Sequence, residues 1–253
     1  MPDAPIPFEN HVVILGWDEL AHRIARQLVI ADKQVVVITK QAEAREVIRD
    51  AFSSDAVRVH LSQLNDWTRF DQVNIEAAFK VFVNLDNEEE SLVAILNLKS
   101  LYDGLEFDVV LENQELEDTF YAAGVTYAVS SRNLASKLTA SHLFEPEVAR
   151  YTSDLLSASE AAEEHDIQQY ELLETNAYVG RTWGDLFWTL KEDFNCVPLG
   201  LGWETPDEAG RALEKMPAND RPLRAGEHVI LITAGAQEAA LEDFFGVEEG
   251  IRR

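Results

Sequence analysis

Short apolar runs alternate with amphipathic segments along the first half of the chain. Residues 12–15 form a four-residue aliphatic run that ends at Gly16. Such a run is too short for a buried helix and is typical of a central strand in a parallel sheet. After it, apolar residues recur at the spacing of one helix face from Leu20 to Leu28. The pattern predicts a strand, a tight turn and a helix, which is how a βαβ unit begins.

The same alternation continues to about residue 130. Further strands are predicted at 35–38, 57–61, 81–85, 109–111 and 127–129, separated by helical segments at 40–51, 67–75, 86–101 and 116–123. Parallel strands joined by helices imply right-handed crossovers and a doubly wound sheet. The predicted fold class for residues 10–130 is therefore α/β, a Rossmann-like lobe with a parallel sheet. Residues 1–10 contain three prolines and no periodicity, and we expect an extended linker there.

The chain changes character after residue 130. Residues 131–160 show no strand signal and predict a helical crossover arm, with a break near Pro146. Such an arm is either an oligomerisation element or a helix pair that packs back on its own sheet, and the periodicity does not separate the two. Residues 161–253 predict a smaller α+β lobe, with strands at 167–173, 197–201 and 229–233 and helices at 186–194 and 237–245. Thr182 is the expected N-cap of the first of these helices.

The charge of the chain narrows the classes of partner. The sequence has 46 acidic and 21 basic residues, a formal net charge of −25. A field of this sign repels phosphate, so nucleic acid and anionic membranes are excluded as partners. Acidic residues are spread over the whole chain, which favours a strongly solvated or salt-adapted surface over one local cation site. The single cysteine, Cys196, and the lack of a long apolar run or signal peptide are typical of a cytoplasmic protein.

Catalytic motifs are absent from the sequence. The six histidines show no metal-binding spacing such as HExxH, and Cys196 has no companion cysteine. There is neither a GxSxG elbow nor a GxxxxGK[ST] loop. We therefore expect a protein that is not an enzyme.

The turn at Gly16 is the place where a Rossmann-type fold would hold a nucleotide. The dinucleotide fingerprint requires a second glycine where this chain has Asp18, and Trp17 lies between the two positions. A carboxylate at the helix N-terminus would repel phosphate. After the second strand, Thr39 stands where an acidic residue would bind the ribose hydroxyls. Gly16, Trp17, Asp18 and Thr39 therefore predict a vestigial nucleotide pocket, and NAD is not expected as a cofactor.

Several segments taken in order resemble RCK domains, the regulators of potassium conductance, in their two-lobe TrkA-N plus TrkA-C arrangement. They are HVVILGW at 11–17, FVNLDNEEES at 82–91, VVLEN at 109–113, AAGVTYAVSS at 122–131 and RPLRAGEHVILI at 221–232. The resemblance covers nearly the whole chain. It implies the cytoplasmic gating-ring domain of a prokaryotic ligand-gated potassium channel. Such domains pair as dimers through the helices between the lobes, assemble into an octameric ring, and are tethered to a membrane pore domain that this chain lacks.

The resemblance also implies a position for a cation site. In the calcium-gated branch of the family the ligands fall on Asn84, Glu112 and Gln114 of this sequence, and only Glu112 is a carboxylate. Exchange of carboxylates for amides weakens a Ca²⁺ site. The nearby Asp86, Glu88 and Glu115 are expected to compensate if Ca²⁺ or another cation binds, and the alternative is a solvated helix start at 86–90.

Two other functions are compatible with a Rossmann-like lobe. One is the nucleotide-binding peripheral subunit of a Trk-type potassium uptake system, which the glycine-poor turn at Gly16 disfavours. The other is a Rossmann oxidoreductase, for which the sequence offers no catalytic constellation.

Overall fold

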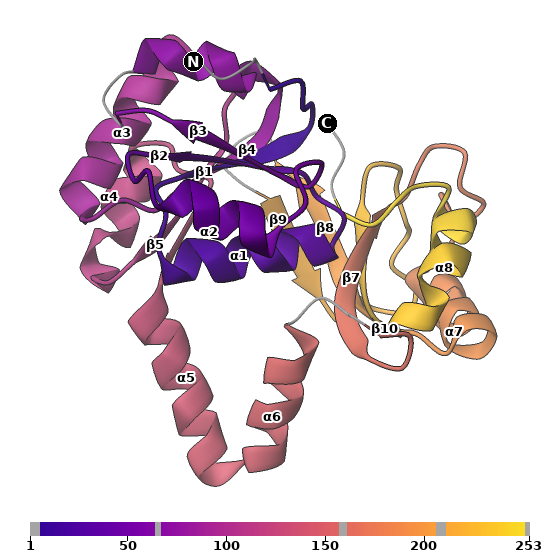
Figure 1. Ribbon diagram of the computed structural model, residues 1–253. Coiled ribbons are helices and arrows are strands. Elements are labelled where there is room, and N and C mark those ends of the chain that lie inside the picture. Colours follow the sequence, from indigo (N-terminus) through magenta and orange to yellow (C-terminus); the bar gives the residue numbers. More distant parts are fainter. Residues whose placement is uncertain (1–5, 64–66, 157–160, 206–210, 251–253) are drawn as a thin grey trace. The chain divides into compact units, whose positions relative to one another are not determined.

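The computed structural model describes residues 6–63, 67–156, 161–205 and 211–250 (Figure 1). The chain divides into two compact units, Met1–Ala140 and Ser141–Arg253. Among the described residues, no helix combines the length and the apolar character that crossing a bilayer requires.

The first unit is built on a six-stranded parallel sheet. Its strands are β1 (His11–Leu15), β2 (Val35–Thr39), β3 (Val57–Leu61), β4 (Ala78–Val83), β5 (Phe107–Leu111) and β6 (Tyr127–Ser130). They lie in the order β3-β2-β1-β4-β5-β6, so the winding reverses between β1 and β4. This confirms the predicted Rossmann-like sheet. In such a sheet, the carboxyl edge at the reversal is where ligands bind.

Both faces of this sheet are covered by helices, which explains why every residue of β1 is buried. The helices that cover it are α1 (Glu19–Ile30), α2 (Ala44–Ala51), α3 (Glu88–Leu101) and α4 (Glu117–Ala122), whereas α5 (Ser131–Phe144), which follows β6, has no buried residue. Successive strand residues point to opposite faces. Val13 and Leu15 accordingly join a core with α3 and α4, while Ile14 joins a second core with α1 and α2. Figure 1 shows α1 and α2 side by side on one face.

The predicted helix at 67–75 is wrong. The structure has two short 3-10 segments, Trp67–Val73 and Ile75–Ala77, separated by Asn74 in the left-handed conformation with φ 52°. Asparagine tolerates this conformation better than most residues. Its side-chain amide donates to the carbonyl oxygen of Phe8 at 2.8 Å. A contact with a residue so distant in the sequence favours the turn over a continuous helix.

Residues 6–10, which fall in the expected linker, pack against the first unit. Ile6 and Phe8 are buried in the core beside Phe70 and Ile75. The backbone N–H of Asn10 donates to Ala77 at 2.8 Å. Residues 1–5 lie outside the described part of the chain.

The second unit contains a four-stranded antiparallel sheet, as expected for an α+β lobe. Its strands are β7 (His165–Glu171), β8 (Val197–Glu204), β9 (Arg211–Lys215) and β10 (His228–Ala234), in the order β7-β10-β8-β9. Its helices are α6 (Pro146–Leu155), α7 (Trp183–Phe194) and α8 (Glu238–Phe245). Tyr170 of β7 stacks on Phe245 of α8, with ring centroids 4.9 Å apart, at the centre of the core.

Strand boundaries and one strand were predicted incorrectly. β4 and β5 begin three and two residues earlier than expected, because Lys80 and Asp108 interrupt the apolar pattern of the strands. The Nζ of Lys80 lies 3.0 Å from Oδ1 of Asp108. Because each charged side chain has a partner, both strands can include these residues. β9 was missed because it is an edge strand without a fully buried residue. The expected break at Pro146 is confirmed, since α5 ends at Phe144 and α6 begins at Pro146.

Candidate functional site

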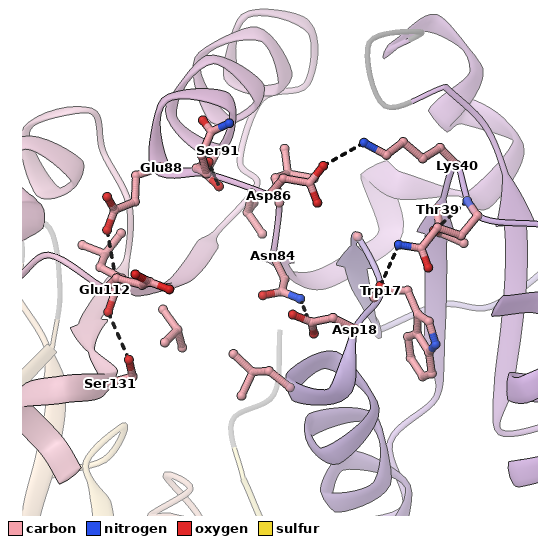
Figure 2. Close-up of a pocket in the computed structure, with 18 residues that line it drawn as sticks. Trp17, Asp18, Thr39, Lys40, Asn84, Asp86, Glu88, Ser91, Glu112 and Ser131 are labelled. Atoms are coloured by element: carbon pink, nitrogen blue, oxygen red, sulfur yellow. Dashed lines mark hydrogen bonds and ion pairs between the residues drawn. The ribbon is translucent and has the colours of Figure 1, made fainter. Parts of the chain in front are cut away.

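A pocket of about 510 Å³ lies at the carboxyl edge of the parallel sheet (Figure 2). It collects residues from the ends of β1, β2, β4 and β5, from α1 and α3, and from the start of α5. The lining residues are Gly16, Trp17, Asp18, Leu20, Thr39, Lys40, Gln41, Val83, Asn84, Leu85, Asp86, Asn87, Glu88, Ser91, Val110, Leu111, Glu112 and Ser131. The pocket therefore occupies the reversal point of the sheet, where ligands bind in folds of this kind.

Gly16 lets the turn after β1 pass close to the end of β4. Its φ is +100°, and a Cβ built on it would lie 1.9 Å from the carbonyl oxygen of Asn84. The N–H of Gly16 donates to Ile38 and the N–H of Asn84 donates to Leu15, both at 2.8 Å. These contacts hold β1, β2 and β4 together at the floor of the pocket. A glycine is thus required here by the packing of the backbone, whether or not a phosphate is ever bound.

Asp18 occupies the N-terminus of α1. Its Oδ1 accepts from the backbone N–H of Ala21 at 2.9 Å and from the side-chain amide of Asn84 at 2.7 Å. Figure 2 shows Asn84 and Asp18 facing each other across the pocket floor. An N-terminal N–H group that would bind phosphate is therefore already paired with a negatively charged side chain. A pyrophosphate group at this helix start would compete with the Asp18 carboxylate for the N–H of Ala21.

An ion pair spans the pocket between β2 and β4. The Nζ of Lys40 lies 2.9 Å from Oδ2 of Asp86 (Figure 2). The hydrogen bond and the charge of Asp86 raise the pKa of Lys40 above its usual value. Beside them, the side-chain amide of Gln41 donates to the carbonyl of Trp17 at 3.1 Å. Thr39 is buried, and its hydroxyl accepts from the N–H of Gln41. Lys40 therefore places a positive charge at the end of β2, where the dinucleotide fingerprint has an acidic residue.

The carboxylate of Glu88 organises the far side of the pocket. Its Oε1 accepts from the backbone N–H groups of Glu112 and Asn113, at 3.0 and 2.9 Å. These bonds tie the first turn of α3 to the loop after β5. The Glu112 side chain instead pairs with Arg132 at 3.2 Å, and both side chains are largely exposed.

The structure brings together part of the predicted cation site. Asn84, Asp86, Glu88 and Glu112 line the pocket, whereas Gln114 and Glu115 do not. Asn113 caps the 3-10 turn that contains them by accepting from the N–H of Glu115. Within the described ranges, no three His, Cys, Asp or Glu side chains lie close enough to hold a metal ion. Asp86 is paired with Lys40, so a cation that binds the Asp86 carboxylate would have to displace the Lys40 ammonium group.

Sequence reasoning missed the role of Arg132 as the partner of Glu112. Arg132 follows Glu112 by 20 residues and belongs to a helix on the other side of β6. No local pattern relates the two positions. Only the sheet order β4-β5-β6 brings the loop after β5 close to the start of α5.

Comparison with known proteins agrees with this fold. Residues 12–131 match the TrkA-N domain. The probable ion channel POLLUX of Oryza sativa subsp. japonica is 24% identical over 243 residues, which are 88% of this chain and 24% of that protein. The human SLO3 gating ring superposes with a TM-score of 0.74 at 17% identity, over 93% of this chain and 50% of that one. The GsuK channel bound to NAD gives a TM-score of 0.47 at 18% identity, over 98% of this chain and 42% of that one.

These matches confirm the TrkA-N prediction for the first lobe and show that most of the chain has the fold of one chain of the SLO3 gating ring. The chain spans about a quarter of the curated relative and half of the SLO3 gating-ring chain.

Proposed function

We propose that this chain is a cytoplasmic ligand-sensing module of a potassium channel, one subunit of a gating ring that couples ligand binding to a membrane pore. The observation that carries the proposal is the fold. Residues of both units, in the same order, correspond to those of a gating-ring chain over 93% of this sequence. The ion-channel relative in rice supports the same class of protein.

The arrangement of the pocket supports a sensor rather than an enzyme. The carboxylates of Asp18, Asp86 and Glu88 each accept hydrogen bonds from the protein itself. None of them is placed as a free acid or base with a nucleophile beside it. The Lys40–Asp86 pair joins strand ends on the two sides of the reversal point. A ligand that competes for Lys40 or Asp86 would break this ion pair and favour a conformation with a different distance between the two strand ends. A switch requires such a difference in ligand affinity between two conformations.

An exposed apolar surface supports assembly with further copies of the chain. We call this the arm surface, and its residues lie on or next to α5 and α6. Their exposed fractions are Leu143 81%, Phe144 71%, Leu156 62%, Tyr151 57% and Val148 51%. Large apolar side chains at such exposure, within one short stretch of the chain, are typical of an interaction site. We infer that a second copy of the chain covers the arm surface in a symmetric dimer.

The first prediction concerns this dimer. Sedimentation velocity should show dimers or larger assemblies, and Phe144→Ser should shift the population to monomers because it places a hydroxyl in an apolar interface. Met216→Ser is the matched control, since Met216 is 86% exposed and directly follows β9, away from the arm surface in the sequence. A parent chain that stays monomeric at high concentration and at several salt concentrations would contradict the proposal.

The second prediction concerns the ligand. We expect NAD and ADP to give no saturable thermal shift, because Asp18 already occupies the N–H group that phosphate needs. Asp86 lines the pocket and is held only by the exposed Lys40, so a cation such as Ca²⁺ that displaces the lysine is the class of ligand we propose to test. Asp86→Asn should weaken any shift that Ca²⁺ produces, with Asp118→Asn on the exposed start of α4 as the control. Saturable binding of a nucleotide would instead favour the Trk-type peripheral subunit.

A further inference from the structure

The turn between α3 and β5 contains the only Asp-Gly step of the sequence, Asp103-Gly104. These are the central residues of the turn, and both are exposed. Gly104 has a φ of +79°, which the third residue of a type II turn requires. The turn lies at the amino end of β5, whereas the pocket lies at the carboxyl edge of the same sheet. The proposed sensing function therefore does not use it.

The groups that would react with each other in this turn are unpaired. Within the described part of the chain, no hydrogen bond uses the N–H of Gly104 or the carboxylate of Asp103. A Cβ built on Gly104 meets no atom within 4 Å, so the space around its backbone is open. Backbone nitrogens inside a helix or a sheet are instead held by their hydrogen bonds. The nitrogen of Gly104 is thus accessible to the side chain that precedes it.

Asp108, five residues later, lacks all of these features. Its carboxylate pairs with Lys80 at 3.0 Å, and the residue belongs to β5. The next residue is Val109, whose branched side chain crowds the backbone nitrogen and whose backbone pairs with both β4 and β6. Asp108 is therefore a natural comparison for Asp103 within the same segment.

We propose that Asp103 is a site of spontaneous isomerisation to isoaspartate. The nitrogen of Gly104 attacks the side-chain carboxyl carbon of Asp103, a C–N bond forms and one water molecule leaves, which closes a five-membered succinimide ring. Water then adds to the main-chain carbonyl carbon of Asp103, and the bond from that carbon to the Gly104 nitrogen breaks. The main chain now runs through Cβ and Cγ of residue 103. Water is lost and regained, so the reaction needs no oxidant or reductant.

The product has a longer backbone between two anchored residues. Tyr102 is 7% exposed and Leu105 is 8% exposed, and both belong to the core of the first unit. The hydroxyl of Tyr102 also donates to Asp71 at 2.8 Å. An added methylene in the backbone displaces one of these anchors, and a close-packed core is sensitive to such a change. The isomerised chain keeps every pocket residue, so the inference goes beyond the sensing function and does not depend on it.

The test incubates the full folded chain in water enriched in oxygen-18 at neutral pH, then digests it with trypsin in ordinary water. Hydrolysis of the succinimide inserts one oxygen atom from the solvent. We expect the label to increase with time at Asp103, together with a second chromatographic peak of the same peptide that resists cleavage before residue 103 by an aspartate-specific protease. Asp108 lies in the same tryptic peptide, residues 100–132, and should stay unlabelled.

Three variants assign the reaction to this turn. Asp103→Glu should abolish it, because the longer side chain would have to close a six-membered ring, while the charge is unchanged. Gly104→Ala should slow it, because a methyl group hinders approach to the nitrogen. Gly180→Ala is the matched control, since Gly180 also has a positive φ, +84°, and open space around it. This control should label at Asp103 as fast as the parent chain.

A second measurement follows the structural consequence. The isomerised chain, separated by ion-exchange chromatography, should melt at a lower temperature and exchange amide hydrogens faster in peptides that cover the end of α3 and the start of β5. Asp103→Glu, incubated for the same time, should show neither change. The proposal is overturned if the folded parent gains no label at Asp103, if label appears only in urea, or if Gly104→Ala reacts as fast as the parent. Equal labelling of Asp103 and Asp108 would also overturn it.

Discussion

Gly16→Ala should destabilise the first unit by about 3 kcal/mol. A residue with a Cβ costs about 1–2 kcal/mol at a φ of +100°, and forcing a methyl group into a packed site costs about 1–3 kcal/mol more. The Cβ would lie 1.9 Å from the Asn84 carbonyl oxygen, which belongs to the backbone and cannot rotate away. The end of β4 must therefore move away from β1, which weakens the hydrogen bond from Asn84 to Leu15.

Gly104→Ala is the matched control for this prediction. Gly104 also has a positive φ, +79°, but a Cβ there meets no atom within 4 Å. This change should cost only about 1 kcal/mol, from the backbone conformation alone. Hydrogen exchange read on peptides from β1 and β4, together with urea denaturation, measures both variants. Equal losses from the two changes would show that the close approach at Gly16 contributes nothing to stability.

Arg221→Met should destabilise the second unit by about 3–5 kcal/mol, because it leaves Glu227 buried without its partner. The Glu227 side chain is 5% exposed, and its two oxygens lie 2.6 and 2.9 Å from the guanidinium nitrogens of Arg221. Arg221 also pairs with Glu214 of β9 at 3.0 Å and bonds to the carbonyl of Pro222. One side chain thus links the edge strand to the turn before β10, and its loss should increase hydrogen exchange in both.

The exposed pair of Arg132 and Glu112 provides the control. Both side chains are more than three-quarters exposed, so Arg132→Met should cost less than about 1 kcal/mol. A double variant, Arg221→Met with Glu227→Gln, should recover part of the stability lost in Arg221→Met, since the uncompensated charge is removed. If Arg221→Met is as mild as Arg132→Met, Glu227 is stabilised by groups other than the guanidinium.

The hydrophobic pattern alone determined the architecture of both units. The aliphatic run of β1 predicts a strand buried on both faces, and its two faces do join two separate cores. Gly16 and Pro146 predicted a turn and a helix break that the structure contains. These signals are local, because each depends on residues within one strand or one helical turn. The sequence prediction failed at two places. At Asn74, a hydrogen bond to the distant Phe8 favours a turn over a helix. The strand β9 lies at the edge of its sheet and has no fully buried residue.

The chemistry of the pocket at the carboxyl edge of the parallel sheet depended on the tertiary structure. The sequence placed Asp18, Asp86 and Glu112 at strand ends, but it did not indicate that each would be bonded to a group of the protein itself. Lys40 and Asp86 are 46 residues apart, and only the order β2-β1-β4 brings them within 2.9 Å.

His228 was one of six histidines without a motif. Its Nδ1 lies 2.6 Å from a guanidinium nitrogen of Arg211, 17 residues earlier on a strand that the pattern did not reveal. Periodicity records which face of an element is buried, because burial is a property of each residue in its own strand or helix. Hydrogen bonds between side chains depend on strand order and register, which relate positions far apart in the chain. The sequence by itself therefore determined the fold of each unit, and only the tertiary structure decided which polar groups remain free to bind a ligand.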